Sequence, residues 1–115
     1  LHGVGVSGKQ LGRTIGFPTA NMQLYEPLKM LPGRGAYLTV VDTLGGHFYG
    51  MTNVGEIVET HILDFSENIY GLDLVVKFKK RLRDDKRFNS VSELKSQLVI
   101  DEGTCRSLCE GLPLL

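Results

Sequence analysis

The sequence lacks an excess of either charge, a long apolar run and a cysteine-rich framework. Its 115 residues carry 13 Lys+Arg and 13 Asp+Glu, so the broad positive field that drives non-specific nucleic-acid binding is absent. No apolar run approaches the roughly 18 residues that span a bilayer, and 42% hydrophobic residues suit a globular chain. We predict one domain over residues 1–115 that binds neither nucleic acid nor membrane and holds any anionic ligand at a local site.

Cysteine occurs twice, as Cys105 and Cys109 in a stretch predicted to be helical. Neighbours on one helical face have parallel Cβ vectors, which disfavour a disulfide. We expect reduced thiols in the core and a reducing, cytoplasmic location. A metal site is the alternative, but neither His nor a further Cys lies near them in sequence. Residues 1–3 show neither the basic nor the apolar region of a secretory signal.

Sequence patterns typical of β-strands recur along most of the chain. The expected strands are residues 1–7, 36–43, 47–54, 57–65 and 72–82, with a hairpin turn at residues 44–46. Glycines and a proline interrupt residues 8–21, which we therefore predict to be a loop. Alternation in 57–65 places Glu59 and His61 on one face, whereas Ile62 and Asp64 share the other. In 72–82, apolar residues through Leu82 are expected to point inward.

A capping box, Ser90-Val-Ser-Glu93, opens a predicted C-terminal helix. Its apolar positions recur at intervals of three and four residues, namely Val91, Leu94, Leu98, Cys105, Leu108 and Cys109. Several strands with regular turns followed by one helix predict a mainly β fold, a small antiparallel barrel capped by that helix.

Two phosphate-binding patterns near the N-terminus lack the structure that they require. Residues 3–8 fit G-x-G-x-x-G, and residues 3–9 fit G-x-x-x-x-G-K. Both patterns hold phosphate at the start of a helix, but the ten residues after Lys9 contain two glycines and a proline. Glycine-rich turns also bind anions through successive backbone N–H groups, with Lys9 or Arg13 adding charge. An anion-binding loop and a simple turn both remain open.

Pro18 stiffens the segment that presents Thr19 and Asn21, because it fixes its own φ and biases Phe17 toward extended geometry. Alternate residues of an extended chain point the same way. A Thr hydroxyl and an Asn carbonyl on one side are hard oxygen ligands that suit Mg²⁺. A Thr/Asn turn closed by its own side-chain hydrogen bonds accounts for the same residues.

Five sequence blocks stand in a specific order: Gly-Arg-x-x-Gly-Phe-Pro-Thr-Ala-Asn at 12–21, Asn53-Val-Gly, Glu-Thr-His-Ile-Leu-Asp-Phe at 59–65, Tyr70-Gly, and Leu-Arg-Asp-Asp-Lys-Arg-Phe at 82–88. From about Gly3 to Asp101 the chain thus resembles riboflavin kinase, a family that includes the kinase half of bifunctional flavokinase/FAD synthetases. The resemblance implies a six-stranded antiparallel Greek-key β-barrel with a C-terminal α-helix. It also implies Mg²⁺-dependent transfer of the ATP γ-phosphate to the 5′-hydroxyl of riboflavin, giving ADP and FMN.

The resemblance further implies site residues. Thr19 and Asn21 would ligate Mg²⁺ and contact the nucleotide phosphates, and Glu59 would be the catalytic carboxylate. The remaining assignments are Gly8 and Arg13 in the ATP site, Ile62, Asp64 and Tyr70 near the nucleotide, and Arg83, Lys86 and Phe88 on the flavin side. The glycine-rich stretch departs from the usual bacterial pattern at Ser7, Lys9, Gln10 and Leu11.

Physical chemistry agrees with a base at Glu59, since a strand face can hold a carboxylate rigidly against a primary alcohol. His61 on the same face is expected to be a satisfied core histidine. Phe88 suits either stacking on an isoalloxazine ring or packing against the helix that follows it.

The link between the Asn-x-Gly and Glu-x-His blocks is shorter than in the resembled family, because only residues 56–58 separate Gly55 from Glu59. We expect that a mobile loop between Gly55 and Glu56 is omitted from the sequence. The alternative is a true deletion closed by a two-residue turn.

Two other functions are compatible with the pattern. A non-enzymatic flavin-binding barrel of the flavin-reductase kind needs a ring pocket but not Thr19, Asn21 or Glu59. A structural barrel uses the glycine-rich stretch only as a turn. No adenylyltransferase motif lies within the chain, so a monomeric kinase and the kinase part of a fused synthetase both remain expected.

Overall fold

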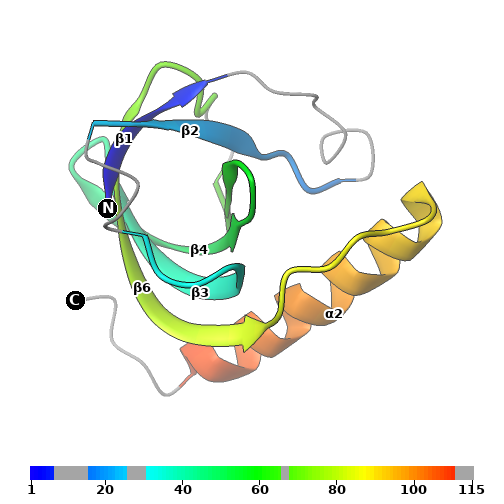
Figure 1. Ribbon diagram of the computed structural model, residues 1–115. Coiled ribbons are helices and arrows are strands. Elements are labelled where there is room, and N and C mark those ends of the chain that lie inside the picture. The colour runs from blue at the N-terminus through cyan, green and yellow to red at the C-terminus, as the bar shows by residue number, and fades with distance from the viewer. Residues whose placement is uncertain (7–15, 26–30, 66–67, 111–115) are drawn as a thin grey trace.

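Alternating apolar residues and local turn chemistry give the described part of this chain six strands and one long helix (Figure 1). The structure, a computed structural model, describes residues 1–6, 16–25, 31–65 and 68–110. The strands are β1 (His2–Val6), β2 (Ala20–Leu24), β3 (Gly35–Thr43), β4 (Gly46–Val54), β5 (Val58–Ile62) and β6 (Asp73–Arg83), and the helix is α2 (Val91–Cys109).

The strands close into a barrel in the order β1-β2-β5-β4-β3-β6, and every neighbouring pair is antiparallel. Strands β3, β4 and β5 follow one another as neighbours, and β6 returns to lie beside β3. That arrangement is a Greek key. The predicted six-stranded Greek-key barrel with a C-terminal helix is confirmed.

The β3–β4 hairpin follows from local chemistry. Thr43 pairs with Gly46, which leaves Leu44 and Gly45 as a two-residue turn. Both turn residues have positive φ, 49° and 73°, as a type I′ turn requires. The turn predicted at residues 44–46 is therefore confirmed.

The barrel interior combines an apolar cluster with a chain of buried hydroxyls. The cluster comprises Met22, Val41, Val58, Ile62, Leu74 and Val76. Thr52 Oγ1 lies 3.1 Å from both Thr39 Oγ1 and Thr60 Oγ1, and the Thr60 hydroxyl donates to Met22 Sδ at 3.4 Å. Because each buried hydroxyl has a partner, these threonines fit the core without unsatisfied groups.

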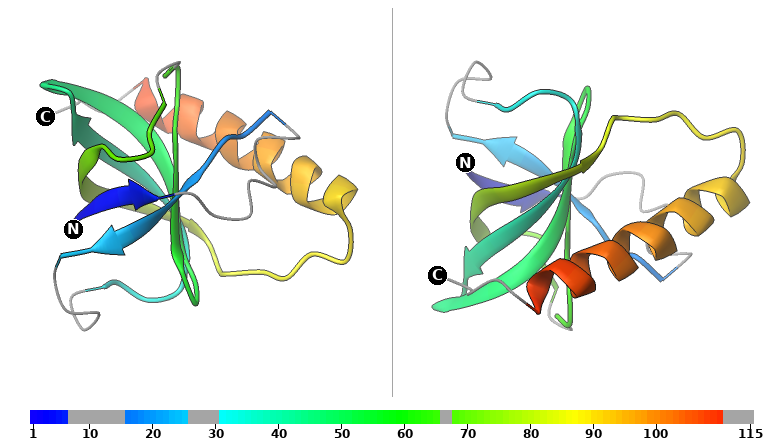
Figure 2. Two further views of the ribbon diagram at one scale, coloured as in Figure 1. Left: turned by 90° about the horizontal axis from the view of Figure 1, so that it is seen from above. Right: turned by 90° about the horizontal axis from the view of Figure 1, so that it is seen from below.

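Helix α2 crosses one side of the barrel (Figure 2). Ser90 caps it by accepting from the Glu93 N–H at 3.1 Å, while the Glu93 carboxylate accepts from the Asn89 N–H at 2.9 Å. A second apolar cluster fills the space between helix and barrel, and comprises Phe17, Leu38, Met51, Leu63 and Cys105. Within the described residues, no helix combines the length and apolar character needed to cross a bilayer.

Both cysteines are free thiols, as predicted. Cys105 is fully buried against the barrel, and this burial raises the pKa of its thiol to about 12. Burial also raises the pKa of the half-buried Cys109 thiol. Among the described residues, no group of three or more His, Cys, Asp or Glu side chains is placed to hold a metal ion.

Three local predictions are wrong. The loop expected over residues 8–21 ends earlier, because β2 begins at Ala20 and pairs with both β1 and β5. The strand expected over 57–65 ends at Ile62, and Asp64 takes a left-handed φ of 54° that an Asp tolerates. Register shifts opposite Ala36/Tyr37 and Leu38/Thr39 change the alternation of β6, so Leu82 packs toward α2 instead of the barrel interior.

The short link after Asn53-Val-Gly closes as a tight connection between two paired strands. Val54 pairs with Val58, and the Gly55 N–H donates to the Ile57 carbonyl at 3.1 Å. Residues 55–57 therefore close a three-residue connection between β4 and β5. This connection is one residue longer than the two-residue turn considered for a true deletion, and the omitted loop stays a prediction.

Candidate active site

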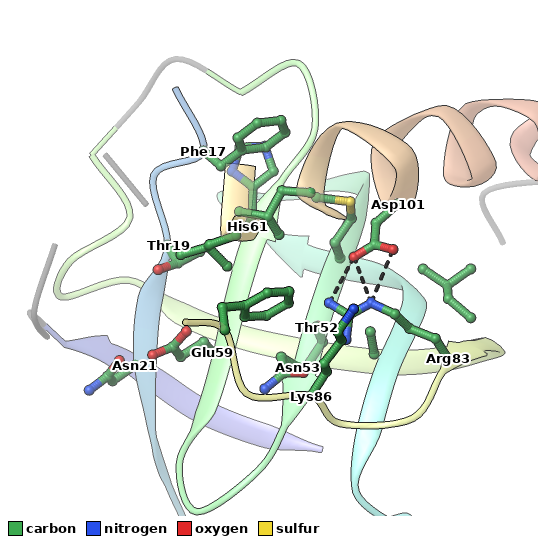
Figure 3. Close-up of a pocket in the computed structure, with 16 residues that line it drawn as sticks. Phe17, Thr19, Asn21, Thr52, Asn53, Glu59, His61, Arg83, Lys86 and Asp101 are labelled. Carbon is green, nitrogen blue, oxygen red and sulfur yellow. Dashed lines mark hydrogen bonds and ion pairs between the residues drawn. The ribbon is translucent and has the colours of Figure 1, made fainter. Parts of the chain in front are cut away.

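A cavity of about 250 Å³ opens between the outer face of the barrel and the N-terminal half of α2 (Figure 3). Strands β2, β4 and β5 supply one wall, and the end of β6 with the residues after it supplies another. Six of the residues assigned from the sequence line this pocket: Thr19, Asn21, Glu59, Arg83, Lys86 and Phe88. Positions up to 69 residues apart along the chain thus meet at one place.

Glu59 stands at the centre of the polar wall. On β5 it alternates with the buried Val58 and Thr60, so its side chain leaves the barrel. Strand pairing places Asn21 of β2 on one side of it and Asn53 of β4 on the other. Thr19 lies two residues before Asn21 and lines the same pocket. A carboxylate and two amides therefore converge on rigid, paired strands, and the Thr19 hydroxyl lies beside them just before β2.

The opposite wall carries a buried ion pair. Arg83 Nε donates to both Asp101 oxygens at 3.1 and 3.0 Å, and Arg83 Nη2 donates to Oδ2 at 2.9 Å. Gln97 donates to the same carboxylate at 2.9 Å. The side chains of Arg83 and Asp101 are only 18% and 6% exposed. This pair joins β6 to α2 and holds the guanidinium at the pocket edge.

Phe88 adds an aromatic surface to that wall. The Arg83 guanidinium lies 5.8 Å from its ring centroid, and Lys86 Nζ lies 5.6 Å from it, within the range of cation–π attraction. Leu94 and Leu98 of α2 line the cavity nearby. This half of the pocket suits a flat, largely apolar ring system with polar edges.

Asp101 and Asn53 are site residues that the sequence reasoning missed. Asp101 was detectable, since it continues the spacing of Leu94, Leu98 and Cys105 on the buried face of the helix. A charged residue on such a face needs a buried partner. Asn53 belongs to a recognised sequence block, but only strand pairing places it beside Glu59.

The residues present fit a hard divalent cation. Thr19 and Asn21 are half-buried on the pocket wall. Neither side chain has a hydrogen-bond partner in the part of the chain that the structure describes. The turn closed by their own side-chain bonds is therefore not seen among those residues. A hydroxyl and an amide oxygen would supply part of a Mg²⁺ shell that substrate phosphates and water complete.

Other assigned residues lie elsewhere. Ile62 is 3% exposed and belongs to the interior apolar cluster. Asp64 accepts two hydrogen bonds of 3.0 Å from Arg106, which lower its pKa, and it lines a separate groove. Tyr70 lies outside the pocket lining, and its N–H donates to Asn68 Oδ1 at 3.0 Å. Gly8 and Arg13 lie outside the described residues.

Comparisons with known proteins agree with this geometry. The family model described as "Flavokinase: Riboflavin kinase" matches residues 1–109. A bifunctional riboflavin kinase/FMN adenylyltransferase of Escherichia coli (strain K12) is 38% identical over 116 aligned positions, which cover 92% of this chain and 36% of that protein. The chain thus spans about a third of this relative's length. Because the alignment is longer than the chain, the relative has residues with no counterpart here.

Two solved structures share the fold. A structure described as a macrolide-efflux protein from Streptococcus pneumoniae has a TM-score of 0.85 and 35% identity, covering 91% of this chain and 37% of that one. Riboflavin kinase from Trypanosoma brucei has a TM-score of 0.68 and 23% identity, covering 96% of this chain and 79% of that one. The match of the family model to residues 1–109, together with the barrel and its pocket, establishes that the chain belongs to the riboflavin kinase family.

Proposed function

We propose that this chain transfers the γ-phosphate of ATP to the 5′-hydroxyl of riboflavin and releases FMN and ADP. The observation that carries the proposal is the position of Glu59. It stands between Asn21 and Asn53, beside Thr19 and in the same pocket as Arg83 and Phe88. A base, oxygen donors for a metal–phosphate group and a surface for an aromatic ring thus share one cavity.

Glu59 is the proposed general base. It accepts the proton of the riboflavin 5′-hydroxyl as that oxygen forms its bond to the γ-phosphorus and the bond from the γ-phosphorus to the ADP oxygen breaks. Phosphoryl transfer asks little covalent chemistry of a protein, so catalysis depends on positioning and charge stabilisation. Paired strands on both sides of Glu59 supply that rigidity.

Thr19 and Asn21 form the proposed phosphate end of the site. Mg²⁺, when bound there, would neutralise charge on the phosphates. Gly8 and Arg13 are proposed to complete the ATP site, with Ile62, Asp64 and Tyr70 near the nucleotide as the resemblance implies. None of Ile62, Asp64 and Tyr70 lines the pocket, so these three assignments depend on the resemblance alone.

Phe88, Leu94 and Leu98 form the proposed flavin end. The aromatic ring offers a stacking face, and the two leucines offer apolar contact on the helix side. Arg83 and Lys86 lie over Phe88 and present donors to the polar edge of the isoalloxazine.

One assay tests the proposal. Purified protein with ATP, Mg²⁺ and riboflavin is expected to form FMN and ADP in equal amounts, and EDTA is expected to stop the reaction. Saturable riboflavin binding without FMN formation would favour the non-enzymatic flavin-binding barrel. Action in the cytoplasm, either as a monomer or as the kinase part of a fused FAD synthetase, is part of the proposal, supported by the two free thiols and the fused relative.

A further inference from the structure

We propose that His61 is a positioning residue that holds residues 17–19 against β5 and thereby sets where Thr19 stands relative to Glu59. The inference rests on the proposed function, since it assigns His61 to the metal-nucleotide end of that site. His61 lines the pocket, and its side chain donates a hydrogen bond to the backbone carbonyl of Pro18.

The β2–β5 ladder ends where Thr19 begins. Ala20 pairs with Thr60 and Asn21 pairs with Glu59, and these are the only two pairs between the strands. Continuation of the ladder would need backbone bonds from Pro18, which has no N–H to donate. Thr19 therefore stands just beyond the last paired residue, without a ladder bond to fix its backbone.

The His61 side chain joins the segment before β2 to β5 in place of a ladder bond. Its Nδ1 lies 2.7 Å from the Pro18 carbonyl oxygen. A carbonyl only accepts, so Nδ1 must carry the proton. The contact thus exists in both the neutral and the protonated imidazole, and in the neutral form the lone pair lies on Nε2.

Phe17 anchors the other end of the segment. Its ring is 7% exposed and packs in the cluster between barrel and helix. It also meets the His61 ring edge-to-face, with centroids 5.6 Å apart and an interplanar angle of 67°. Ala20 on the far side is fully buried in β2. Thr19 is thus held between fixed points, of which the Pro18 contact is the one that His61 controls.

Loss of the His61 hydrogen bond is therefore expected to weaken nucleotide binding selectively. A displacement of about 1 Å in a positioning group can lower a rate about 100-fold, whereas loss of one neutral hydrogen bond leaves most of a fold intact. Riboflavin binds at the other end of the pocket, against Phe88 and the helix, and is expected to be affected little.

Two substitutions separate the hydrogen bond from the ring. In His61→Asn, the side-chain nitrogen stands as many bonds from Cα as Nδ1, so the donor to Pro18 is kept. In His61→Phe the ring contact with Phe17 is kept and the donor is lost. His61→Leu, which has the shape of the Asn variant but no donor, replaces the Phe variant if the latter fails to fold. His47→Phe is the matched control, because His47 pairs with Asp42 outside the pocket.

The measurements are KM for MgATP, KM for riboflavin, and Kd for MgADP by calorimetry. His61→Phe, or His61→Leu in its place, is expected to raise the MgATP KM and the MgADP Kd about tenfold, as loss of one aligned hydrogen bond predicts. The riboflavin KM is expected to stay within about twofold, as are all constants of His47→Phe. His61→Asn is expected to restore most of the nucleotide affinity.

Unchanged nucleotide constants in His61→Phe would overturn the proposal, as would equal weakening of both substrates. Equal impairment of His61→Asn and His61→Phe would also overturn it, because the Nδ1 donor would then not be the property that matters. The calorimetric measurement of MgADP binding does not require turnover. A wild-type protein that forms no FMN would refute the proposed function, while the MgADP affinities of the variants would still decide the role of His61.

Discussion

Replacing Asp101 by Asn is expected to destabilise the protein, because it removes one charge from a buried pair. The carboxylate is 6% exposed and receives three hydrogen-bond contacts of 2.9–3.1 Å from Arg83 and one of 2.9 Å from Gln97. The substitution keeps the shape and one acceptor oxygen. It leaves the Arg83 guanidinium with only 18% of its side chain exposed and no opposing charge.

The expected loss is about 2–3 kcal/mol in the free energy of unfolding. Removing one partner of a fully buried ion pair costs about 3–5 kcal/mol. Arg83 retains some solvent contact and its bond to the Asp84 carbonyl, so the expected loss falls just below that range. For a domain of this size the loss corresponds to a fall in Tm of about 10 °C.

Urea denaturation and calorimetry would measure the change, with two controls. Asp64→Asn makes the same chemical change at an exposed pair and should cost less than about 1 kcal/mol, since the Arg106 and Asp64 side chains are 47% and 75% exposed. The double variant Arg83→Met with Asp101→Leu removes both charges and should be more stable than Asp101→Asn. A loss below about 1 kcal/mol in Asp101→Asn, or a double variant no more stable than it, would refute the reasoning.

Four further outcomes are expected. Glu59→Gln should keep fold and ATP binding while lowering kcat roughly 100-fold or more; near wild-type turnover would rule out the proposed base. Thr19→Ala should weaken MgADP binding in calorimetry far more than riboflavin binding, because it removes a hard oxygen donor. Cys105, with its pKa raised to about 12, should resist iodoacetamide at pH 9 in the native protein and react once urea unfolds it. The lowered Asp64 pKa gives stability that is present above the unfolded value near 4 and lost as pH falls through the folded one; Arg106→Gln should raise that pKa in an NMR titration.

Short-range chemistry determined several parts of this protein from sequence alone. The hairpin at residues 44–45 needs two positive φ angles, and the start of α2 needs a capping side chain at Ser90. The ordered sequence blocks identified the family and six residues that line the pocket. Each of these inferences depends on residues that are close in sequence or on a motif that is contiguous.

Contacts between residues far apart in the sequence determined the extent of β2 and the partners of several side chains. Residues 20 and 21 end the stretch expected to be a loop, yet they begin β2 because β1 and β5 flank it in the closed barrel. Alternation predicted that Asp64 shares a strand face with Ile62, yet β5 ends at Ile62 and Asp64 pairs with Arg106 of α2. Asp101 gains its role from Arg83, and His61 from Pro18, partners 18 and 43 residues away. Such contacts form only when barrel closure and helix docking bring distant side chains together, so no local pattern in the sequence could specify them.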